Sequence, residues 1–464
     1  RHSGLFLYLL MECLSNKLFL SSPISDSEKS TDTEKASFEK KKIEIYKKIQ
    51  RLREEIEQIE AQELEPLEKE NPVQYADRLG LIYSSNVIQK HKKENGQYFT
   101  SVEIARFLAS LSHKFEKTVK ILDPGCGAGI LTCALVEHLV SNSNKLKEID
   151  ITSYEIDTNL ISYTTRAFSY LKEWCISKQI DLIFEIIHGD FILNNKFVFG
   201  FDRKQKETNS DFDIVISNPP YFKLSKEDKR AIIAQSVTNG HPNIYSIFMA
   251  ASLKLLKEGG EFIFITPRSF SSGNYFKTFR NFFFFSVRLD YIHLFVSRKE
   301  TFERDNVLQE TIIMKGQKNF DAEKNNVVTI TSSKSADDLE KCKIKAYNYK
   351  ELIDLSSKEK ILHTPISDFE EKIFKLFKNW NSRLQDYDLQ ISTGPVVAHR
   401  AVNFIRDTEE PGSVPLFWLH NVNKMEVNPL NQKPNKGQYI QLVQKSLSIL
   451  VKNRDYIFLR RFSS

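Results

Sequence analysis

The sequence predicts an α/β fold with a mostly parallel sheet, an N-terminal helical extension and a separate C-terminal domain. Between residues 71 and 330, short apolar runs bounded by turn residues alternate with helix-length patterns. This alternation is typical of βαβ units, in which helices cover a parallel sheet. The 464 residues allow two or three domains. Because 41% of them are hydrophobic, including 34 Phe, a wholly disordered chain is excluded.

In the alternating region, five apolar runs are expected to form strands, with helix-length patterns between them. The strands are expected at Val119–Leu122, Ile149–Tyr154, Ile183–Ile187, Phe212–Ser217 and Glu261–Ile265, and the helices at Leu131–Val140, Asn159–Trp174 and Tyr245–Leu256. In such a fold the ligand lies at the carboxyl ends of the strands. The motifs described below follow these ends.

Five segments are expected along the chain: 1–36, 37–70, 71–330, 331–388 and 389–464. The first is predicted to be a disordered or non-native start and linker, since the first methionine is Met11 and residues 21–36 are rich in Ser, Thr, Asp and Lys. An amphipathic helix is predicted for Phe38–Glu70, and residues 331–388 are a connecting region. Because Tyr456–Arg461 resembles a strand with no closing turn, the chain is expected to be a fragment.

Positive charge is concentrated in the last segment. Residues 389–464 hold ten Lys/Arg and five acidic residues, so they carry +5 of the net charge of +6. This clustering favours a polyanionic partner, and a solvated basic face is the alternative.

The five cysteines follow neither a CxxC spacing nor a regular pattern, which argues against a disulfide framework or a zinc site. A reducing cytoplasm fits this usage. The apolar stretch Leu5–Leu20 is interrupted by Glu12, Asn16 and Lys17, so it is too polar for a membrane span.

A glycine-rich loop follows the first predicted strand, in the sequence Asp123-Pro-Gly-Cys-Gly-Ala-Gly-Ile130. The three glycines allow a tight turn that brings backbone N–H groups close to a ligand, and Asp123 offers a carboxylate at the strand tip. Alone, this loop is weak evidence, since it also occurs in dinucleotide-binding proteins.

Two further acids follow the next two strands. Glu155 can bind the two hydroxyls of a ribose, and Asp190 can accept a hydrogen bond from an adenine amine that Phe191 covers. Each acid could instead be a helix cap. Three acids at successive strand tips indicate a cofactor that contains adenosine.

The fourth strand leads into Asn218-Pro-Pro-Tyr221. The amine of adenine is a poor nucleophile because its lone pair is delocalised into the ring. An Asn oxygen and a backbone carbonyl that accept its two hydrogens favour tetrahedral geometry, and Tyr221 can stack on the base. The prolines add no competing N–H donors, although Asn-Pro-Pro is also a turn signal.

Together these motifs resemble the S-adenosylmethionine-dependent adenine-N6 DNA methyltransferases of the gamma class, found in bacterial restriction–modification systems. The resemblance extends over Gly96–Lys315 and implies a Rossmann-like methyltransferase domain. More loosely, residues 392–396 and 416–419 resemble the recognition region of the subgroup typified by the PstI methyltransferase. Residues 389–464 are therefore expected to form a target-recognition domain, truncated at its end.

The resemblance also implies which residues form the site. The cofactor residues are expected to be Tyr98, Phe99, Thr100, Asp123, Pro124, Gly125, Cys126, Gly127, Glu155, Ile156, Asp190 and Phe191. The catalytic residues are expected to be Asn218, Pro219, Pro220 and Tyr221, with Phe302 as a second aromatic residue on the flipped base. Thr100 has a competing interpretation as the start of a capping box with Glu103, and Phe302 as an ordinary core residue.

The expected activity is methyl transfer from S-adenosylmethionine to the N6 amine of a flipped adenine in double-stranded DNA, which protects the site from a cognate restriction endonuclease. No nucleophilic cysteine and no metal are required. The alternatives are a protein-glutamine methyltransferase, an RNA adenine methyltransferase and a catalytically silent DNA-binding subunit.

Overall fold

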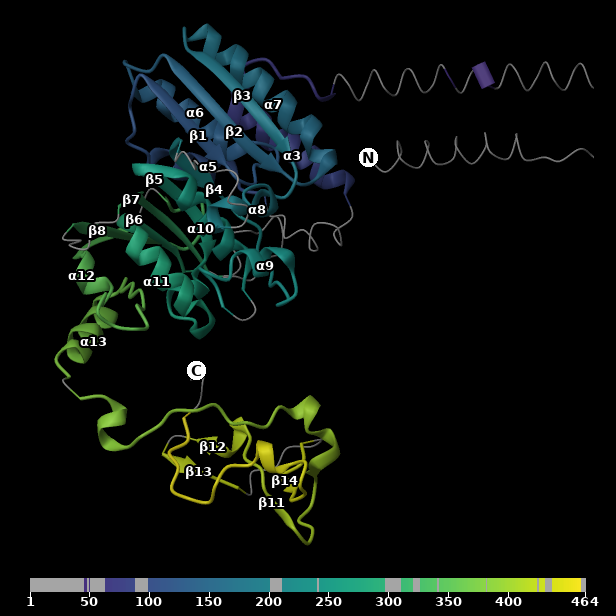
Figure 1. Cartoon of the computed structure of the whole chain (residues 1–464), viewed down its shortest axis with the longest axis vertical. Helices are drawn as coiled ribbons and strands as arrows, with labels where there is room; N and C mark the ends of the chain where they lie inside the picture. Colours follow the sequence, from purple (N-terminus) through teal and green to yellow (C-terminus); the bar gives the residue numbers. More distant parts are fainter. Residues whose placement is uncertain are drawn as a thin grey trace, which may run out of the picture. The chain divides into compact units, whose positions relative to one another are not determined.

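The computed structural model describes residues 46–47, 50, 63–87, 99–200, 211–239, 242–296, 310–319, 326–339, 342–380, 382–423, 425–429 and 436–459. The chain divides into two compact units, residues 1–372 and 373–464 (Figure 1). This division falls within helix α13 (Asp368–Lys378), before the boundary at 389 that the charge distribution suggested.

Unit 1 is built on one large sheet. Its strands are β1 (Thr118–Asp123), β2 (Glu148–Glu155), β3 (Asp181–His188), β4 (Phe212–Ser217), β5 (Leu256–Pro267), β6 (Val287–Phe295), β7 (Thr311–Lys318), β8 (Val327–Ser333) and β9 (Lys343–Asn348). Among the described residues the strand order is β3-β2-β1-β4-β5-β7-β6-β8-β9. The first five strands are parallel, so their carboxyl ends share one edge. Strand β7 is antiparallel to both β5 and β6. The predicted α/β class and mostly parallel sheet are confirmed.

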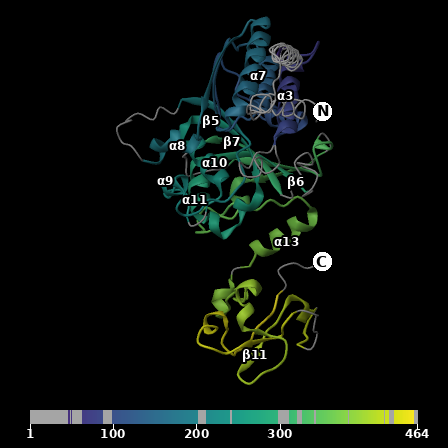
Figure 2. The same cartoon turned by 90° about the vertical axis from the view of Figure 1, so that its right-hand side faces the viewer.

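Two groups of helices cover the sheet. The helices of unit 1 are α3 (Pro72–Asn86), α5 (Val102–Ser110), α6 (Ile130–Asn142), α7 (Thr158–Ser177), α8 (Phe191–Asn194), α9 (Lys229–Ile233), α10 (Ile244–Leu255), α11 (Lys277–Ser286) and α12 (Tyr349–Leu352). Helix α3 packs on α6 and α7, and α5 packs on α6. Helices α3 and α7 lie side by side in Figure 2. Helices α10 and α11 contact each other and form the second group.

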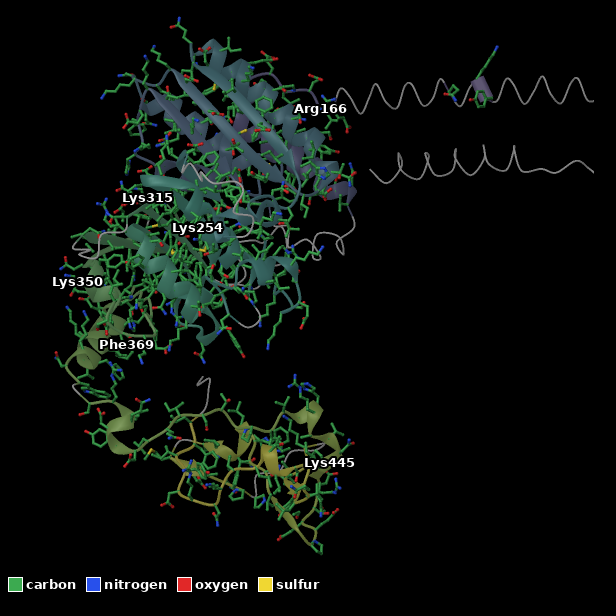
Figure 3. All side chains as sticks on the ribbon, viewed as in Figure 1. Arg166, Lys254, Lys315, Lys350, Phe369 and Lys445 are labelled. Atoms are coloured by element: carbon green, nitrogen blue, oxygen red, sulfur yellow. The ribbon has the colours of Figure 1, made fainter. Side chains whose placement is uncertain are left out.

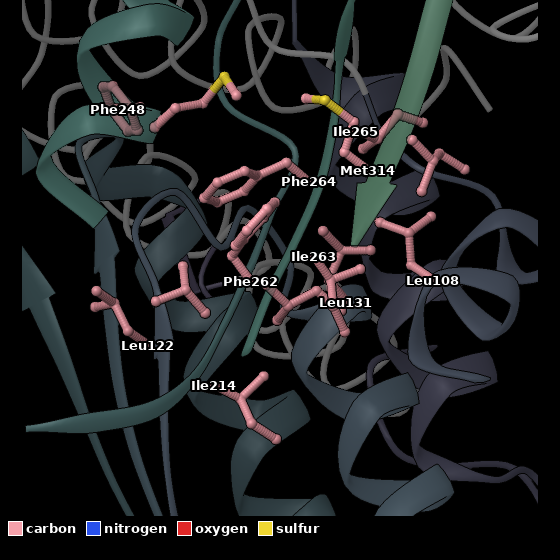
Figure 4. Packing of buried hydrophobic residues seen from close by; sticks show 14 of the residues in the cluster. Leu108, Leu122, Leu131, Ile214, Phe248, Phe262, Ile263, Phe264, Ile265 and Met314 are labelled. Atoms are coloured by element: carbon pink, nitrogen blue, oxygen red, sulfur yellow. The ribbon is translucent and has the colours of Figure 1, made fainter. Parts of the chain in front are cut away.

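The central strand β5 is apolar on both faces because helices cover both sides. Phe262 and Phe264 stack with ring centroids 5.2 Å apart, and Phe262 meets Phe283 of α11 edge to face. The alternating residues Ile263 and Ile265 point to the other face, toward α5 and α6 (Figure 4). Such uninterrupted apolar sequence is typical of a strand buried on both faces.

The antiparallel part of the sheet contains a buried charged cluster. Lys315 on β7, labelled in Figure 3, forms ion pairs with Glu261 on β5 at 3.2 Å and with Asp290 on β6 at 3.1 Å. Glu261 also accepts a hydrogen bond from Ser112 at 2.8 Å, so the cluster ties the end of α5 to the sheet. Burial of these charges is tolerated because each has a partner.

The predicted N-terminal helix Phe38–Glu70 lies mostly outside the described residues. Where its end is described, the prediction is wrong, because residues 64–70 form turns and not a helix. Pro66 interrupts the helical hydrogen bonds, and Lys69 has a left-handed backbone with φ of 65°. A new helix, α3, starts after Asn71, whose side chain accepts from the backbone N–H of Gln74 in a capping box.

Unit 2 has short elements and a small core. Strands β10 (Ile405–Arg406), β14 (Tyr439–Gln441) and β11 (Ser413–Pro415) form an antiparallel sheet, and β12 (Val422–Asn423) pairs with β13 (Glu426–Val427). Apolar side chains of α13 are exposed, including Phe369 in the segment that precedes unit 2 (Figure 3).

Throughout the described ranges, every helix is too short or too polar to cross a membrane.

Candidate active site

A cleft opens at the carboxyl ends of β1 to β4, where the sequence motifs lie. Its empty volume, including the open mouth, is about 970 Å³. The cleft is lined by residues of all four motifs and by several residues outside them. The predicted residues on its wall are Phe99, Thr100, Pro124, Gly125, Cys126, Gly127, Glu155, Ile156, Asp190, Phe191, Asn218 and Pro220.

The glycine loop forms the floor of the cleft. Gly127 and Gly129 have φ of 54° and 87°, in the left-handed region that side chains disfavour. A Cβ at Gly129 would also lie 2.6 Å from the ring of Phe168, so the loop requires glycine there. The N–H of Cys126 donates to the carbonyl of Tyr154 at 3.0 Å, which holds the loop against the end of β2.

Asp123 does not line the cleft, and the direct cofactor contact expected from its position needs correction. Its carboxylate is fully buried, where it accepts from the hydroxyl of Thr132 at 2.8 Å and from the N–H of Gly125 at 3.4 Å. Burial raises the pKa of Asp123 to about 7. Its side chain turns inward beneath the loop, so it supports the loop from below.

Glu155 joins the loops that follow β1 and β2. One carboxylate oxygen accepts from the N–H of Gly127 at 2.9 Å, and the other accepts from the N–H of Asp157 at 2.8 Å. Burial raises the pKa of Glu155, whose residue is only 7% exposed. These bonds use part of the four lone-pair sites of a carboxylate, so further hydrogen bonds to a ligand are possible. Ile156 beside it is exposed on the cleft wall.

Asp190 is both a helix cap and part of the cleft wall. Its Oδ1 accepts from the N–H groups of Ile192 and Leu193 at 2.9 and 3.0 Å, which caps α8. Its Oδ2 lies 3.4 Å from Nη1 of Arg230. The two interpretations that the sequence left open are therefore compatible, because different oxygens serve the cap and the cleft.

Aromatic rings form the apolar side of the cleft. Phe191 is buried, with its ring 5.0 Å from that of Tyr154 and 5.2 Å from that of Phe248, measured between centroids. The guanidinium of Arg230 lies over Phe222, 5.6 Å from the ring centroid. An apolar wall of this kind suits a planar ring system.

Asn218 is held on both sides of its carboxamide. Its Nδ2 donates to Oγ1 of Thr100 at 3.1 Å, and its Oδ1 accepts from the hydroxyl of Tyr221. The Tyr221 hydroxyl also lies 3.0 Å from the carbonyl oxygen of Ile265. The β4 loop and the start of α5, distant in sequence, are thereby joined in the cleft.

Two of the predicted catalytic residues lie behind the wall. Tyr221 is buried, and its ring meets that of Tyr245 edge to face at 6.3 Å. Pro219 is also buried. The structure thus brings Asn218 and Pro220 to the cleft surface and places Tyr221 beneath them. The stacking of Tyr221 on a base stays a prediction.

The capping box expected to start at Thr100 is wrong by one residue. Helix α5 is capped by Ser101, whose Oγ accepts from the N–H of Ile104 at 3.5 Å. Thr100 is buried and bonded to Asn218 instead. Tyr98 and Phe302 lie outside the described residues.

Several wall residues were not predicted from the sequence. They are Ala128, Ile130, Leu131, Tyr154, Leu160, Gly189, Phe222, Arg230, Ile244 and Phe248. Phe222 directly follows the Asn218 motif and Gly189 precedes Asp190, so proximity could have indicated both. Arg230 and Phe248 reach the cleft only through the tertiary fold. In the described part of the chain, His, Cys, Asp and Glu form no group suited to hold a metal ion.

Comparison with known proteins identifies the family. Residues 15–302 match the family model of the Eco57I restriction-modification methylases. The chain belongs to this family. It is 31% identical over 391 residues to the Type II methyltransferase M.BsuBI of Bacillus subtilis, across 82% of this chain and 74% of that protein. It is 29% identical over 381 residues to M.PstI of Providencia stuartii, across 82% and 73% of the two chains.

The solved structures that align with this methylase include a type I restriction–modification methyltransferase subunit from Streptococcus thermophilus. That alignment has a TM-score of 0.39 and 16% identity, and it covers 66% of this chain and 57% of the other. The family and the two curated relatives confirm the resemblance inferred from the motifs, including the PstI subgroup. The chain is a methyltransferase of the restriction–modification type.

Proposed function

We propose that this methylase transfers a methyl group from S-adenosylmethionine to the N6 amine of an adenine within a specific double-stranded DNA sequence. The single observation that carries the proposal is the joining of two kinds of group in one cleft. The strand-tip acids Glu155 and Asp190 line it together with the carboxamide of Asn218. Methylation then protects the sequence from a restriction endonuclease that cuts it, in the cytoplasm where both enzymes meet DNA.

The cleft residues fit a cofactor that contains adenosine. Glu155 has acceptor capacity beyond its two backbone bonds, which suits the vicinal hydroxyls of ribose. Oδ2 of Asp190 faces a guanidinium, so its surroundings already favour a hydrogen-bond donor there, as an adenine amine is. Ile156, Phe191 and Phe248 supply apolar surface for the rings. When bound, S-adenosylmethionine supplies a methyl group activated by a sulfonium.

Asn218 is the proposed catalytic residue. Because its Nδ2 donates to Thr100, its Oδ1 is the acceptor, and it can take a hydrogen from the target amine. A backbone carbonyl of the Pro219–Pro220 segment accepts the second hydrogen. The two acceptors favour tetrahedral nitrogen, so the lone pair becomes available for direct transfer without a covalent enzyme intermediate. Tyr221 donates to the same Oδ1, so the incoming amine joins or replaces an existing bond.

The target base must leave the duplex to reach this loop, at a cost of a few kcal/mol. We propose that Tyr221 and Phe302 hold the extruded adenine by stacking. The basic residues of unit 2, including Arg400, Lys436 and Lys445, are proposed to bind the DNA backbone. Charge neutralisation of this kind predicts that DNA affinity falls with rising salt concentration.

A methyl-transfer assay tests the proposal against its alternatives. With tritiated S-adenosylmethionine, label should enter duplex DNA and be recovered as N6-methyldeoxyadenosine after digestion to nucleosides. Label in RNA or in a protein glutamine would support the other two methyltransferase classes. DNA binding without any transfer would indicate a catalytically silent subunit.

Asn218→Ala provides the residue-level test. The single-turnover rate should fall by roughly 100-fold or more, as when one preorganised polar group is removed from a transition-state site. Affinity for S-adenosylhomocysteine should stay within a few-fold of wild type. Asn142→Ala, at the exposed end of α6, is the control and should retain full activity. A rate for Asn218→Ala equal to that of the control would make Asn218 an ordinary turn residue.

A further inference from the structure

Helix α3 contacts the cleft from behind, although it precedes every motif of the site. Tyr83, near its C-terminal end, is 2% exposed. Its hydroxyl donates to Oδ2 of Asp157 at 2.6 Å, and both groups are buried. This bond joins α3 to the start of α7.

Asp157 is the next link toward the cleft. Its Oδ1 caps α7 by accepting from the N–H of Asn159 at 2.9 Å. Its backbone N–H donates to Oε1 of Glu155 at 2.8 Å. The Tyr83 hydroxyl therefore fixes the carboxylate of Asp157, and the backbone of that residue fixes one oxygen of Glu155. The other oxygen of Glu155 is held by Gly127.

The ring of Tyr83 contacts the cleft wall as well. It meets Phe99 edge to face, with centroids 5.9 Å apart, and it clusters with Ala128 and Leu160. These three residues line the cleft. The ring of Tyr83 thus supports the cleft wall, and its hydroxyl supports Glu155 through Asp157.

We propose that Tyr83 is a positioning residue that holds Glu155 in the orientation required to bind the ribose hydroxyls of the cofactor. The inference rests on the proposed function, because it assumes that Glu155 binds ribose. Tyr83 does not touch the cofactor. It acts through Asp157, and it gives the N-terminal helix a role in cofactor affinity.

The position of α3 does not depend on this hydroxyl. The N–H of Val73 donates to Glu137 of α6 at 2.8 Å, and the hydroxyl of Tyr75 donates to the carbonyl of Leu64 at 2.5 Å. Tyr75 also packs edge to face on Tyr170 of α7, at 5.1 Å. Tyr83→Phe should therefore leave the helix docked while it removes the bond to Asp157.

Tyr83→Phe is the first test, with S-adenosylhomocysteine as the probe and isothermal titration calorimetry as the measurement. The dissociation constant should rise roughly three- to tenfold, the value of about one buried hydrogen bond. Tyr75→Phe is the matched control, since it removes the hydroxyl of another buried tyrosine of the same helix that has no link to Glu155. Its dissociation constant should stay at the wild-type value.

The ribose hydroxyls provide a readout that a merely structural role would not change. For 2′-deoxy and 3′-deoxy S-adenosylhomocysteine, the loss caused by Tyr83→Phe should be smaller than for S-adenosylhomocysteine itself, because one of the two contacts that Tyr83 positions is already absent. An equal loss for all three ligands overturns the inference. An unchanged dissociation constant for S-adenosylhomocysteine also overturns it.

Asp157→Asn is a second variant for the case in which Tyr83→Phe does not fold. Asn is as good an N-cap as Asp, so α7 keeps its start while the amide group faces Tyr83. The amide N–H can donate to the Tyr83 hydroxyl, so a bond to a charged acceptor becomes a weaker neutral one, and the affinity loss should be no larger than that of Tyr83→Phe. The double variant should match Tyr83→Phe, since only one bond is involved. Additive losses would contradict the inference.

These results separate the inference from the proposed function. If the wild-type chain binds S-adenosylhomocysteine but labels no DNA, the proposed DNA target fails while the role of Tyr83 is still measured. If the wild-type chain does not bind S-adenosylhomocysteine, the proposed cofactor and this inference are both overturned.

Discussion

Asp190→Asn tests adenine recognition because the two oxygens of Asp190 have different neighbours. Oδ1 caps α8 through two backbone N–H groups, and Oδ2 faces Arg230 and the cleft. Asn caps helices about as well as Asp, so the retained oxygen can keep the cap. The NH₂ group then occupies the Oδ2 position, where it presents a donor to the donor amine of adenine.

The magnitude follows from that change of polarity. A hydrogen bond to a charged acceptor is worth about 1.5–3 kcal/mol, which corresponds to roughly a 10- to 150-fold rise in the dissociation constant. Stability should change little for Asp190→Asn. Asp190→Ala should lose the cap as well and cost about 0.5–2 kcal/mol of folding free energy.

The assay combines calorimetric titration with S-adenosylhomocysteine and thermal unfolding of both variants. Asp228→Asn is the control, because Asp228 also pairs with Arg230 and caps a short helix, α9, but does not line the cleft. Its cofactor affinity should stay within a few-fold of wild type. If Asp190→Asn binds S-adenosylhomocysteine within twofold of wild type, Asp190 does not recognise the adenine amine. A loss of Tm equal to that of Asp190→Ala would refute the argument from the cap.

Three further predictions concern the loop, the pH dependence and the recognition segment. Because the folded pKa of Asp123 is about 7, above the usual value of about 4, its contribution to stability is full below pH 4 and is lost as the pH rises toward 7. Asp123→Asn should therefore show a smaller fall of Tm between pH 4.5 and 7.5 than wild type, and an unchanged fall would contradict this. Gly129→Ala should lower Tm and weaken S-adenosylhomocysteine binding, because its Cβ would lie 2.6 Å from Phe168; wild-type values would show that the loop can relax. Removal of the chain beyond Leu389 should abolish sequence-specific DNA binding and leave cofactor binding intact, and a truncated chain that still methylates one sequence selectively would place recognition elsewhere.

The five parallel strands, the helices α6, α7 and α10 and most of the cleft could be predicted because local sequence determines them. Apolar runs and helical periods are local patterns, and the parallel arrangement brings the strand ends to one edge. The direction in which a side chain turns at a strand end is not determined by the local sequence. Asp123 and Glu155 both end strands, yet one points under the loop and the other into the cleft. Only packing distinguishes them.

The remaining differences have similar causes. Thr100 and Ser101 are both good caps, and the choice between them depends on Asn218, which is distant in sequence. Arg230 and Tyr83 belong to no motif, because their contacts depend on how α9 and α3 pack. Pro66 is the exception, because a proline inside a helical pattern is a local signal that the helix ends there.

The strand order also bears on how the site assembles during folding. Strand β1 pairs with β2 through Ile121 and Ile151, and the same Ile121 pairs on its other side with Ile214 of β4. The first pairing closes a short loop and the second a much longer one, and longer loops cost more chain entropy. The part of the cleft that contains Glu155 and Asp190 can therefore form from an early, contiguous part of the polypeptide. Asn218 joins them only when β4 pairs with β1, so the cleft is completed by a later and longer-range pairing than the one that forms its first part.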